Sequence, residues 1–126
     1  MAVKRLLLAL LVSGVAMTSA HRAIAQDAGA GAAVFKSQCG ICHSPQAGRN
    51  MVGPSLFGIV GRKSASLSDF EYSGPLKASG ITWTSDNLSK WVAGPAKMVP
   101  GTKMAFPGIT SKGEIRDVVA YLNTLK

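Results

Sequence analysis

The sequence predicts a small all-α domain, and three observations support that prediction. Two segments, one opening near Thr84 and one near Ser111, combine an N-cap residue with apolar residues at helical spacing. No run of residues alternates apolar and polar side chains clearly enough to indicate a strand. The segments between the expected helices are rich in Pro, Gly, Ser and Asn, which is typical of loops.

The N-terminus is typical of a cleaved secretory signal peptide. Two cations, Lys4 and Arg5, precede the apolar run 6–17, and Ala23-Ile24-Ala25 forms a small-x-small cleavage site before Gln26. The apolar run is shorter than the roughly 18 residues of a membrane span. An uncleaved anchor is the alternative, and the cleavage site disfavours it. We therefore expect a protein exported to the periplasm.

Cleavage would remove residues 1–25 and leave one domain, residues 26–126, with no membrane span. Of the 14 lysines and arginines in the chain, 11 lie in this domain against six acids, which gives it a formal charge of +5. Such a charge usually means a solvated surface, and it also steers association with an acidic partner. The basic residues are not interleaved with aromatics, so we expect no nucleic-acid partner.

The first expected helix begins at the cap residue Asp27 and extends to about Gln38. Its glycines and alanines give it a mediocre intrinsic stability, and Val34 and Phe35 are its bulky apolar residues. A small residue such as Gly31 lets another helix approach closely. We therefore expect this helix to need a packing partner.

A second expected helix follows two stretches of loop. Residues 44–61 are rich in Pro, Gly, Ser and Asn, and residues 67–80 are rich in turn formers. Thr84 or Ser85 then opens a short helix, which Gly94-Pro95 ends. Its apolar residues recur at i, i+3 and i+4, namely Leu88, Trp91 and Val92.

The last expected helix has the strongest signals in the chain. It follows residues 98–108, whose prolines and glycines indicate a loop. Ser111 and Glu114 form a capping box at its start. Its apolar stripe consists of Ile115, Val118, Val119 and Leu122. This stripe makes it the natural partner of the first helix.

The motif Cys39-Gly40-Ile41-Cys42-His43 contains the only two cysteines of the chain, and C-x-x-C-H is the attachment signature of c-type haem. One helical turn places both thiols and the imidazole on one face. Two sulfurs can therefore bond one edge of a porphyrin while the imidazole reaches its iron. Structural zinc would need a fourth ligand, and no second Cys/His cluster exists. A redox dithiol would leave the adjoining histidine unexplained.

A second axial ligand must be something other than histidine. His21 lies in the predicted signal peptide, so His43 is the only histidine of the mature domain. The methionines of this domain are Met51, Met98 and Met104. Met51 lies only eight residues beyond His43 and would have difficulty reaching the opposite face of the ring. Spacing therefore favours Met98 or Met104 and does not choose between them.

Residues 99–106, V-P-G-T-K-M-A-F, together with residues 39–43 and the G-I-T-W run at residues 80–83, resemble class I cytochrome c. That family contains mitochondrial cytochrome c and bacterial cytochrome c2 or c550 proteins, and the resemblance covers essentially the whole mature domain. It implies a small cytochrome c fold of three to five helices around one covalently attached haem c, with the first and last helices packed together. The methionine of P-G-T-K-M is the family's sixth iron ligand, which implies Met104.

The resemblance also implies roles for residues around the haem. Pro54 matches the proline whose carbonyl accepts a hydrogen bond from the ligating imidazole. Three side chains match residues that bind or neutralise the propionates, and Thr102 matches a residue that helps there. Those three are Arg62, Tyr72 and Trp83. Phe106 matches the aromatic residue beside the exposed haem edge, and Gly31, Phe35 and Tyr121 match the contact between the terminal helices.

Two residues depart from the family pattern. Trp91 stands where many members have a tyrosine whose hydroxyl touches the methionine sulfur, and an indole can act there only as a donor. Leu76 replaces an asparagine that is common in mitochondrial members, which removes a polar group from the same network.

The resemblance implies an electron carrier rather than an enzyme, acting in respiratory or dehydrogenase-linked transport. We expect a monomer whose Lys97 and Lys103 orient redox partners with acidic docking surfaces, such as a dehydrogenase, cytochrome bc1 or a terminal oxidase. One alternative is a dedicated electron-transfer subunit of a periplasmic dehydrogenase or oxidase complex. Another is a peroxidase-like or gas-binding haem protein, which would require an open sixth coordination site.

Overall fold

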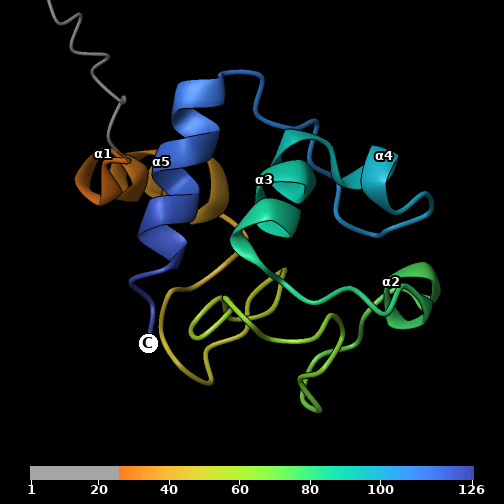
Figure 1. The fold of residues 1–126 in the computed structure, drawn as a ribbon. Helices are drawn as coiled ribbons and strands as arrows, with labels where there is room; N and C mark the ends of the chain where they lie inside the picture. Colours follow the sequence, from red (N-terminus) through yellow and green to blue (C-terminus); the bar gives the residue numbers. More distant parts are fainter. Residues whose placement is uncertain (1–25) are drawn as a thin grey trace, which may run out of the picture.

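The computed structural model describes residues 26–126, and in that range the chain forms five α-helices and one π-helical turn (Figure 1). The predicted signal peptide and its cleavage site lie outside the described residues. The elements are α1 (Ala28–Val34), η1 (Phe35–Cys39), α2 (Gly74–Ala78), α3 (Ser85–Ala93), α4 (Pro95–Met98) and α5 (Lys112–Leu122). The predicted all-α class is confirmed, since the described residues contain one isolated β-bridge and no strand.

The first helix has the predicted extent, but its second half is wider than an α-helix. The carboxylate of Asp27 accepts a hydrogen bond from the Ala30 amide at 3.0 Å, which confirms the predicted cap. In η1 the Gly40 amide donates to the Phe35 carbonyl, five residues earlier, at 2.7 Å. Single π-helical turns of this kind occur mostly inside or at the ends of α-helices near functional sites. Here the turn delivers Cys39.

The helices α1 and α5 pack against each other, as the sequence predicts (Figure 1). Gly31 is buried at the crossing, where a β-carbon would overlap the Asp117 carbonyl and the Tyr121 side chain. The rings of Phe35 and Tyr121 lie 5.2 Å apart beside it, at an angle of 55°. The predicted α5 stripe faces this core, since Val118 is fully buried. A glycine is therefore required for the two backbones to meet.

The helix α3 closes the other side of the α5 core. Thr84 rather than Ser85 is its cap, because the Thr84 hydroxyl accepts from the Asn87 amide at 3.1 Å. The predicted apolar residues of this helix are all buried, namely Leu88, Trp91 and Val92. The expected stop at Gly94-Pro95 is followed at once by the four-residue helix α4, whose first residue is that proline.

The helix α2 lies within a stretch that its composition predicts to be turns. Ser73 caps it by accepting from the Leu76 amide at 3.4 Å, and Pro75 occupies its first turn. Five residues are too few to show helical periodicity, so the sequence pattern misses this helix. Leu76 is the buried residue of this helix.

The long irregular segment between η1 and α2 is tied to the chain around residue 83. The Trp83 amide donates to the Arg62 carbonyl at 2.8 Å, and the Gly61 amide donates to the Trp83 carbonyl at 2.9 Å. An antiparallel bridge between Lys63 and Thr82 continues this pairing. These bonds hold Arg62 and Trp83 side by side, although 20 intervening residues separate them in sequence.

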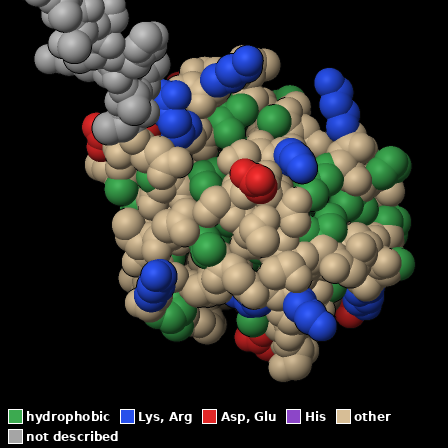
Figure 2. Space-filling view, in the orientation of Figure 1, with side chains coloured by type: hydrophobic (Ala, Val, Ile, Leu, Met, Phe, Trp, Pro, Cys, Tyr) green, Lys and Arg blue, Asp and Glu red, His purple; other side chains and the backbone are tan. Residues whose placement is uncertain are grey.

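The surface of the domain carries dispersed charge. On the face drawn in Figure 2, lysine and arginine side chains are spread over the surface, and some of them lie beside acidic side chains. The one ion pair among residues 26–126 joins Lys77 to Glu71 at 2.6 Å, and both side chains are exposed. No helix within the described range is long and apolar enough to cross a membrane.

Candidate haem site

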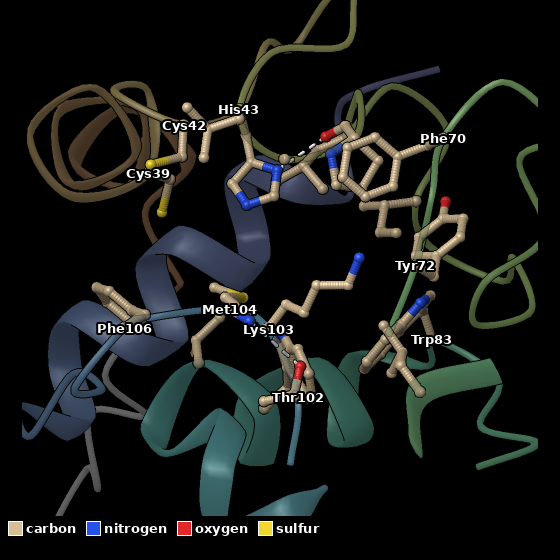
Figure 3. Close-up of a pocket in the computed structure, with 18 of the residues that line it drawn as sticks. Cys39, Cys42, His43, Phe70, Tyr72, Trp83, Thr102, Lys103, Met104 and Phe106 are labelled. Carbon is tan, nitrogen blue, oxygen red and sulfur yellow. Dashed lines mark hydrogen bonds between the residues drawn. The ribbon is translucent and has the colours of Figure 1, made fainter. Parts of the chain in front are cut away.

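The cysteine motif forms a tight turn at the end of η1. The amides of Cys42 and His43 both donate to the Cys39 carbonyl, at 3.0 and 2.9 Å. This turn brings the two free thiols to the same end of a cavity, with the imidazole beside them (Figure 3). The arrangement expected from the spacing of the motif is therefore present.

His43 is buried, with 8% of its surface exposed, and its ring is held by the following loop. Its Nδ1 lies 2.8 Å from the Pro54 carbonyl oxygen. A carbonyl only accepts, so Nδ1 carries the proton of a neutral ring and Nε2 keeps its lone pair. Burial lowers the pKa of His43, against the opposing effect of the Pro54 carbonyl, and this favours the neutral ring.

Gly53 is a site residue that the sequence pattern does not single out. A β-carbon at this position would overlap the imidazole ring of His43. The Gly53 amide also donates to the Cys42 carbonyl at 2.8 Å, which fixes this loop against the cysteine motif. The ring of His43 thus lies directly on a glycine backbone, and the neighbouring proline supplies its acceptor.

The cysteines are partly buried and unpaired. Burial, with a smaller contribution from the Cys42 thiol, raises the pKa of Cys39 to about 11. The free Cys39 thiol is therefore protonated at neutral pH.

Between these groups and the loop after α4 lies a cavity of about 340 Å³. Small-molecule and cofactor sites are typically concave, apolar cavities of roughly this size with a few convergent polar groups. Its walls come from the cysteine motif, the irregular segment, α2, α3, the loop after α4 and Leu122 of α5. All eleven residues that the sequence analysis assigns to the site line this cavity. They are Cys39, Cys42, His43, Pro54, Arg62, Tyr72, Trp83, Trp91, Thr102, Met104 and Phe106.

Met104 lies across the cavity from His43 (Figure 3). Its amide bonds to the Thr102 hydroxyl at 3.4 Å, which ties the loop around it. Met98, the other methionine that spacing allowed, lines a separate shallow groove beside α2. Met51 is 42% exposed at the surface. Among the described methionines, Met104 alone faces the imidazole.

The far end of the cavity from the cysteines is polar and aromatic (Figure 3). The guanidinium of Arg62 donates to the Phe57 and Ser55 carbonyls at 3.1 and 3.0 Å, and burial lowers its pKa. Tyr72 and Trp83 are buried beside it, and burial raises the pKa of Tyr72. A permanent cation and two ring donors thus converge on one end.

The rings of Trp91 and Trp83 pack edge to face, with their centroids 5.1 Å apart. Its indole nitrogen makes no hydrogen bond to any residue in the described range. Leu76 is also buried in this wall, where it adds apolar surface. The two departures from the family pattern therefore make the methionine side of the cavity aromatic and aliphatic.

Two further residues line the cavity beyond those that the sequence analysis assigns to it. Phe70 lies in a turn-rich stretch and packs edge-on against Tyr72, with ring centroids 4.9 Å apart. Lys103, expected as a surface cation, extends over the cavity and donates from Nζ to the Glu71 carbonyl at 3.3 Å (Figure 3). Its position within P-G-T-K-M is the one signal that places it near the site.

These residues fit a covalently attached haem. The cavity is lined mainly by apolar side chains, and two thiols lie at one end with cationic and donor groups at the other. An unprotonated ring nitrogen and a thioether face each other across it, which is the donor pair of His/Met haem iron. The helical fold and this site together define a c-type cytochrome.

The family model of cytochrome c matches residues 28–126. Cytochrome c of Euglena viridis is 45% identical over 100 residues, which cover 79% of this chain and 98% of that protein. Cytochrome c2 iso-2 of Magnetospirillum molischianum is 46% identical over 88 residues, 70% of this chain and 91% of that protein. The solved structure of cytochrome cH from Methylobacterium extorquens superposes with a TM-score of 0.73 at 44% identity, covering 78% of this chain and 98% of that one.

The chain therefore belongs to the cytochrome c family, as a class I c-type cytochrome. Members of the family bind haem c covalently and carry electrons rather than catalyse reactions on substrates. The fold predicted from the resemblance is confirmed by the helical architecture and by the similarity to cytochrome cH.

Proposed function

We propose that this protein is a periplasmic monohaem carrier of single electrons, with haem c attached through Cys39 and Cys42 and its iron bound by His43 and Met104. The observation that carries the proposal is the opposition of His43 and Met104 across one cavity, with both thiols at a single end (Figure 3). Haem held in this way supplies an iron that alternates between the ferric and ferrous states.

The residues around the iron ligands keep the site rigid during electron transfer. The Pro54 carbonyl fixes the imidazole and increases its basicity as a ligand. Thr102 ties the loop that presents Met104. If both His43 and Met104 stay bound in the two oxidation states, little structure would rearrange when the electron moves. His/Met ligation in an apolar pocket favours the less charged ferrous state and so raises the reduction potential.

The polar end of the cavity is suited to the haem propionates. Arg62 supplies a permanent positive charge there, and Tyr72 and Trp83 supply an O–H and an N–H donor. These groups offset the cost of burying carboxylates away from water. Phe106, at the opposite end, lies beside the cysteines where an electron would enter or leave.

The proposed function also includes export from the cytoplasm and association with redox proteins. A signal peptide over residues 1–25 would place haem attachment outside the cytoplasm, where bonding to haem would consume two thiols that could otherwise form a disulfide. The mature monomer would then shuttle between redox proteins, with its net charge of +5 steering it towards acidic surfaces. A dehydrogenase, cytochrome bc1 or a terminal oxidase are the partner classes expected.

A redox titration of the periplasmic protein, followed by its exposure to carbon monoxide, tests this function. We expect one reversible one-electron couple and no carbon monoxide binding to the ferrous protein at neutral pH, because Met104 would hold the iron on the side opposite His43. Ready binding of carbon monoxide would contradict the carrier and favour a gas-binding haem protein.

A further inference from the structure

Two residues, Gln26 and Asp27, precede α1 in the described chain. Asp27 is held by its backbone and by its side chain. Its amide donates to Oδ1 of Asp117 in α5 at 3.1 Å, its carboxylate accepts from the Ala30 amide at 3.0 Å, and its carbonyl accepts from the Gly31 amide at 2.9 Å. Asp27 therefore caps α1 and also ties it to α5, beside the close contact of the two helices (Figure 1).

Gln26, by contrast, is exposed and lies outside any helix. Within residues 26–126, no hydrogen bond holds its side chain. The predicted cleavage site, Ala23-Ile24-Ala25, ends directly before it. Cleavage there would make Gln26 the first residue and give it a free α-amine. An α-amine has a pKa of about 8, so part of it is unprotonated and nucleophilic near neutral pH.

We propose that Gln26 is a modification site, at which the α-amine closes on the side-chain amide of the same residue to form an N-terminal pyroglutamyl lactam. This proposal goes beyond the proposed function but rests on its export and cleavage. The α-nitrogen attacks Cδ, so that a new C–N bond forms and the bond from Cδ to Nε2 breaks. The α-amine gives one proton to the leaving nitrogen, which departs as ammonia. The step consumes no water and no oxidant.

The fold leaves this ring closure unobstructed. Both reacting groups belong to Gln26, and they meet by rotation about the bonds of that one exposed residue. The lactam keeps the peptide bond to Asp27, so the Asp27 amide still donates to Asp117. The modified terminus is therefore compatible with the cap of α1 and with the tie to α5.

The lactam would protect the start of α1. Exposed chain termini are common sites of proteolysis, and an aminopeptidase needs a free α-amine. Removal of Gln26 and then of Asp27 would leave the Ala30 amide without its acceptor. It would also break the tie to α5, on which the seven-residue helix α1 depends. A blocked terminus therefore preserves the contact between the two terminal helices.

The intact mass of the haem-bearing protein, purified from the periplasm, tests the proposal. The matched control is Gln26→Asn, which keeps the side-chain amide but would have to close a ring that is one atom smaller and more strained. Gln26 does not line the cavity, so both proteins should have the same optical spectrum. Labelling with an amine reagent at neutral pH is a second measurement, because lysine side chains, with a pKa of about 10.4, react little there.

We expect the wild type to have the mass of residues 26–126 plus haem, less one molecule of ammonia, and its terminus to resist labelling. Gln26→Asn should have the full mass of its sequence and should be labelled at residue 26. An added aminopeptidase should shorten Gln26→Asn by at least its first residue and leave the wild type unchanged.

Three results would overturn the proposal. A wild type that begins at residue 26 with its full mass and a reactive terminus would show that no lactam forms. Trimming of the wild type as fast as Gln26→Asn would show that the terminus is not protected. A chain that begins at any other residue, or retains residues 1–25, would remove the basis of the proposal by contradicting the cleavage in the proposed function. The measured mass distinguishes this last failure from the first.

Discussion

The imidazole of His43 is positioned by its neighbours rather than by a helix of its own. Its Nδ1 is held by the Pro54 carbonyl at 2.8 Å, and its ring lies against the backbone of Gly53. Its amide is bonded to the Cys39 carbonyl. Three separate contacts therefore fix the direction in which the unprotonated Nε2 points.

Gly53→Ala should displace this ring. The added methyl group would overlap the imidazole, and relieving such overlap in a packed site typically costs about 1–3 kcal/mol. We expect a lower yield of haem-bearing protein and a thermal midpoint reduced by several degrees, measured from the Soret absorbance and by calorimetry. Gly74→Ala is the matched control, because a β-carbon there meets nothing within 4 Å. Equal behaviour of the two variants would refute this role for Gly53.

At the residue scale, the sequence identifies site residues with distinctive side chains, such as cysteine and histidine. It misses residues that matter only because of where their backbone lies. Two cysteines and one histidine in a fixed motif indicate the haem, and the resemblance extends this to Pro54 and Met104. Gly53 contributes only the absence of a side chain, which no local pattern reveals. Lys103 is exposed, as expected of a surface cation, and the fold brings its ammonium group to the Glu71 carbonyl.

The packing of α1 on α5 is the principal helix contact of the domain. It depends on the close backbone approach that Gly31 permits and on the ring pair of Phe35 and Tyr121. The helix α1 contains seven residues, too few to be stable alone in water. Its stability therefore comes from this contact.

Gly31→Ala should destabilise the protein although alanine is the better helix former. Its β-carbon would overlap the Asp117 carbonyl, so the helices must move apart at a cost of about 1–3 kcal/mol. Gly113→Ala in α5 is the control, because its β-carbon meets only side-chain atoms at 3.7 and 3.8 Å. Denaturant unfolding should show Gly113→Ala unchanged or up to about 1 kcal/mol more stable. A stabilising Gly31→Ala would contradict the close crossing.

At the element scale, the sequence predicts the helices that have both a cap and an apolar stripe. The caps at Asp27, Thr84 and Ser111 all form, because a short acceptor side chain satisfies amides locally. The π-helical turn of η1 and the short helices α2 and α4 are missed. All three are too short to show a periodicity of their own.

Considered as a whole molecule, the domain packs much of its apolar core around one cavity. The residues that line it are spread along the chain from Gln38 to Leu122. Without a group bound there, the apolar walls of this cavity would contact water, and a domain of this size would lose much of the apolar burial that stabilises it.

The chain without haem should therefore fold poorly. In Cys39→Ala with Cys42→Ala, which removes both attachment points, we expect no cooperative thermal transition and loss of the near-ultraviolet circular dichroism of the buried tryptophans. Binding of a hydrophobic dye should increase as tertiary packing loosens. A sharp transition within a few degrees of that of the haem-bearing protein would contradict a haem-centred core.

The central claim is that His43 and Met104 close the coordination of one haem iron, and the optical spectrum of the oxidised protein tests it most directly. We predict a low-spin spectrum with the far-red sulfur-to-iron band in the wild type. Met104→Ala should lose that band. Met98→Ala should keep it, because Met98 lines a separate groove. A band that survives in Met104→Ala and disappears in Met98→Ala would contradict the ligand assignment and with it the closed site proposed for this cytochrome.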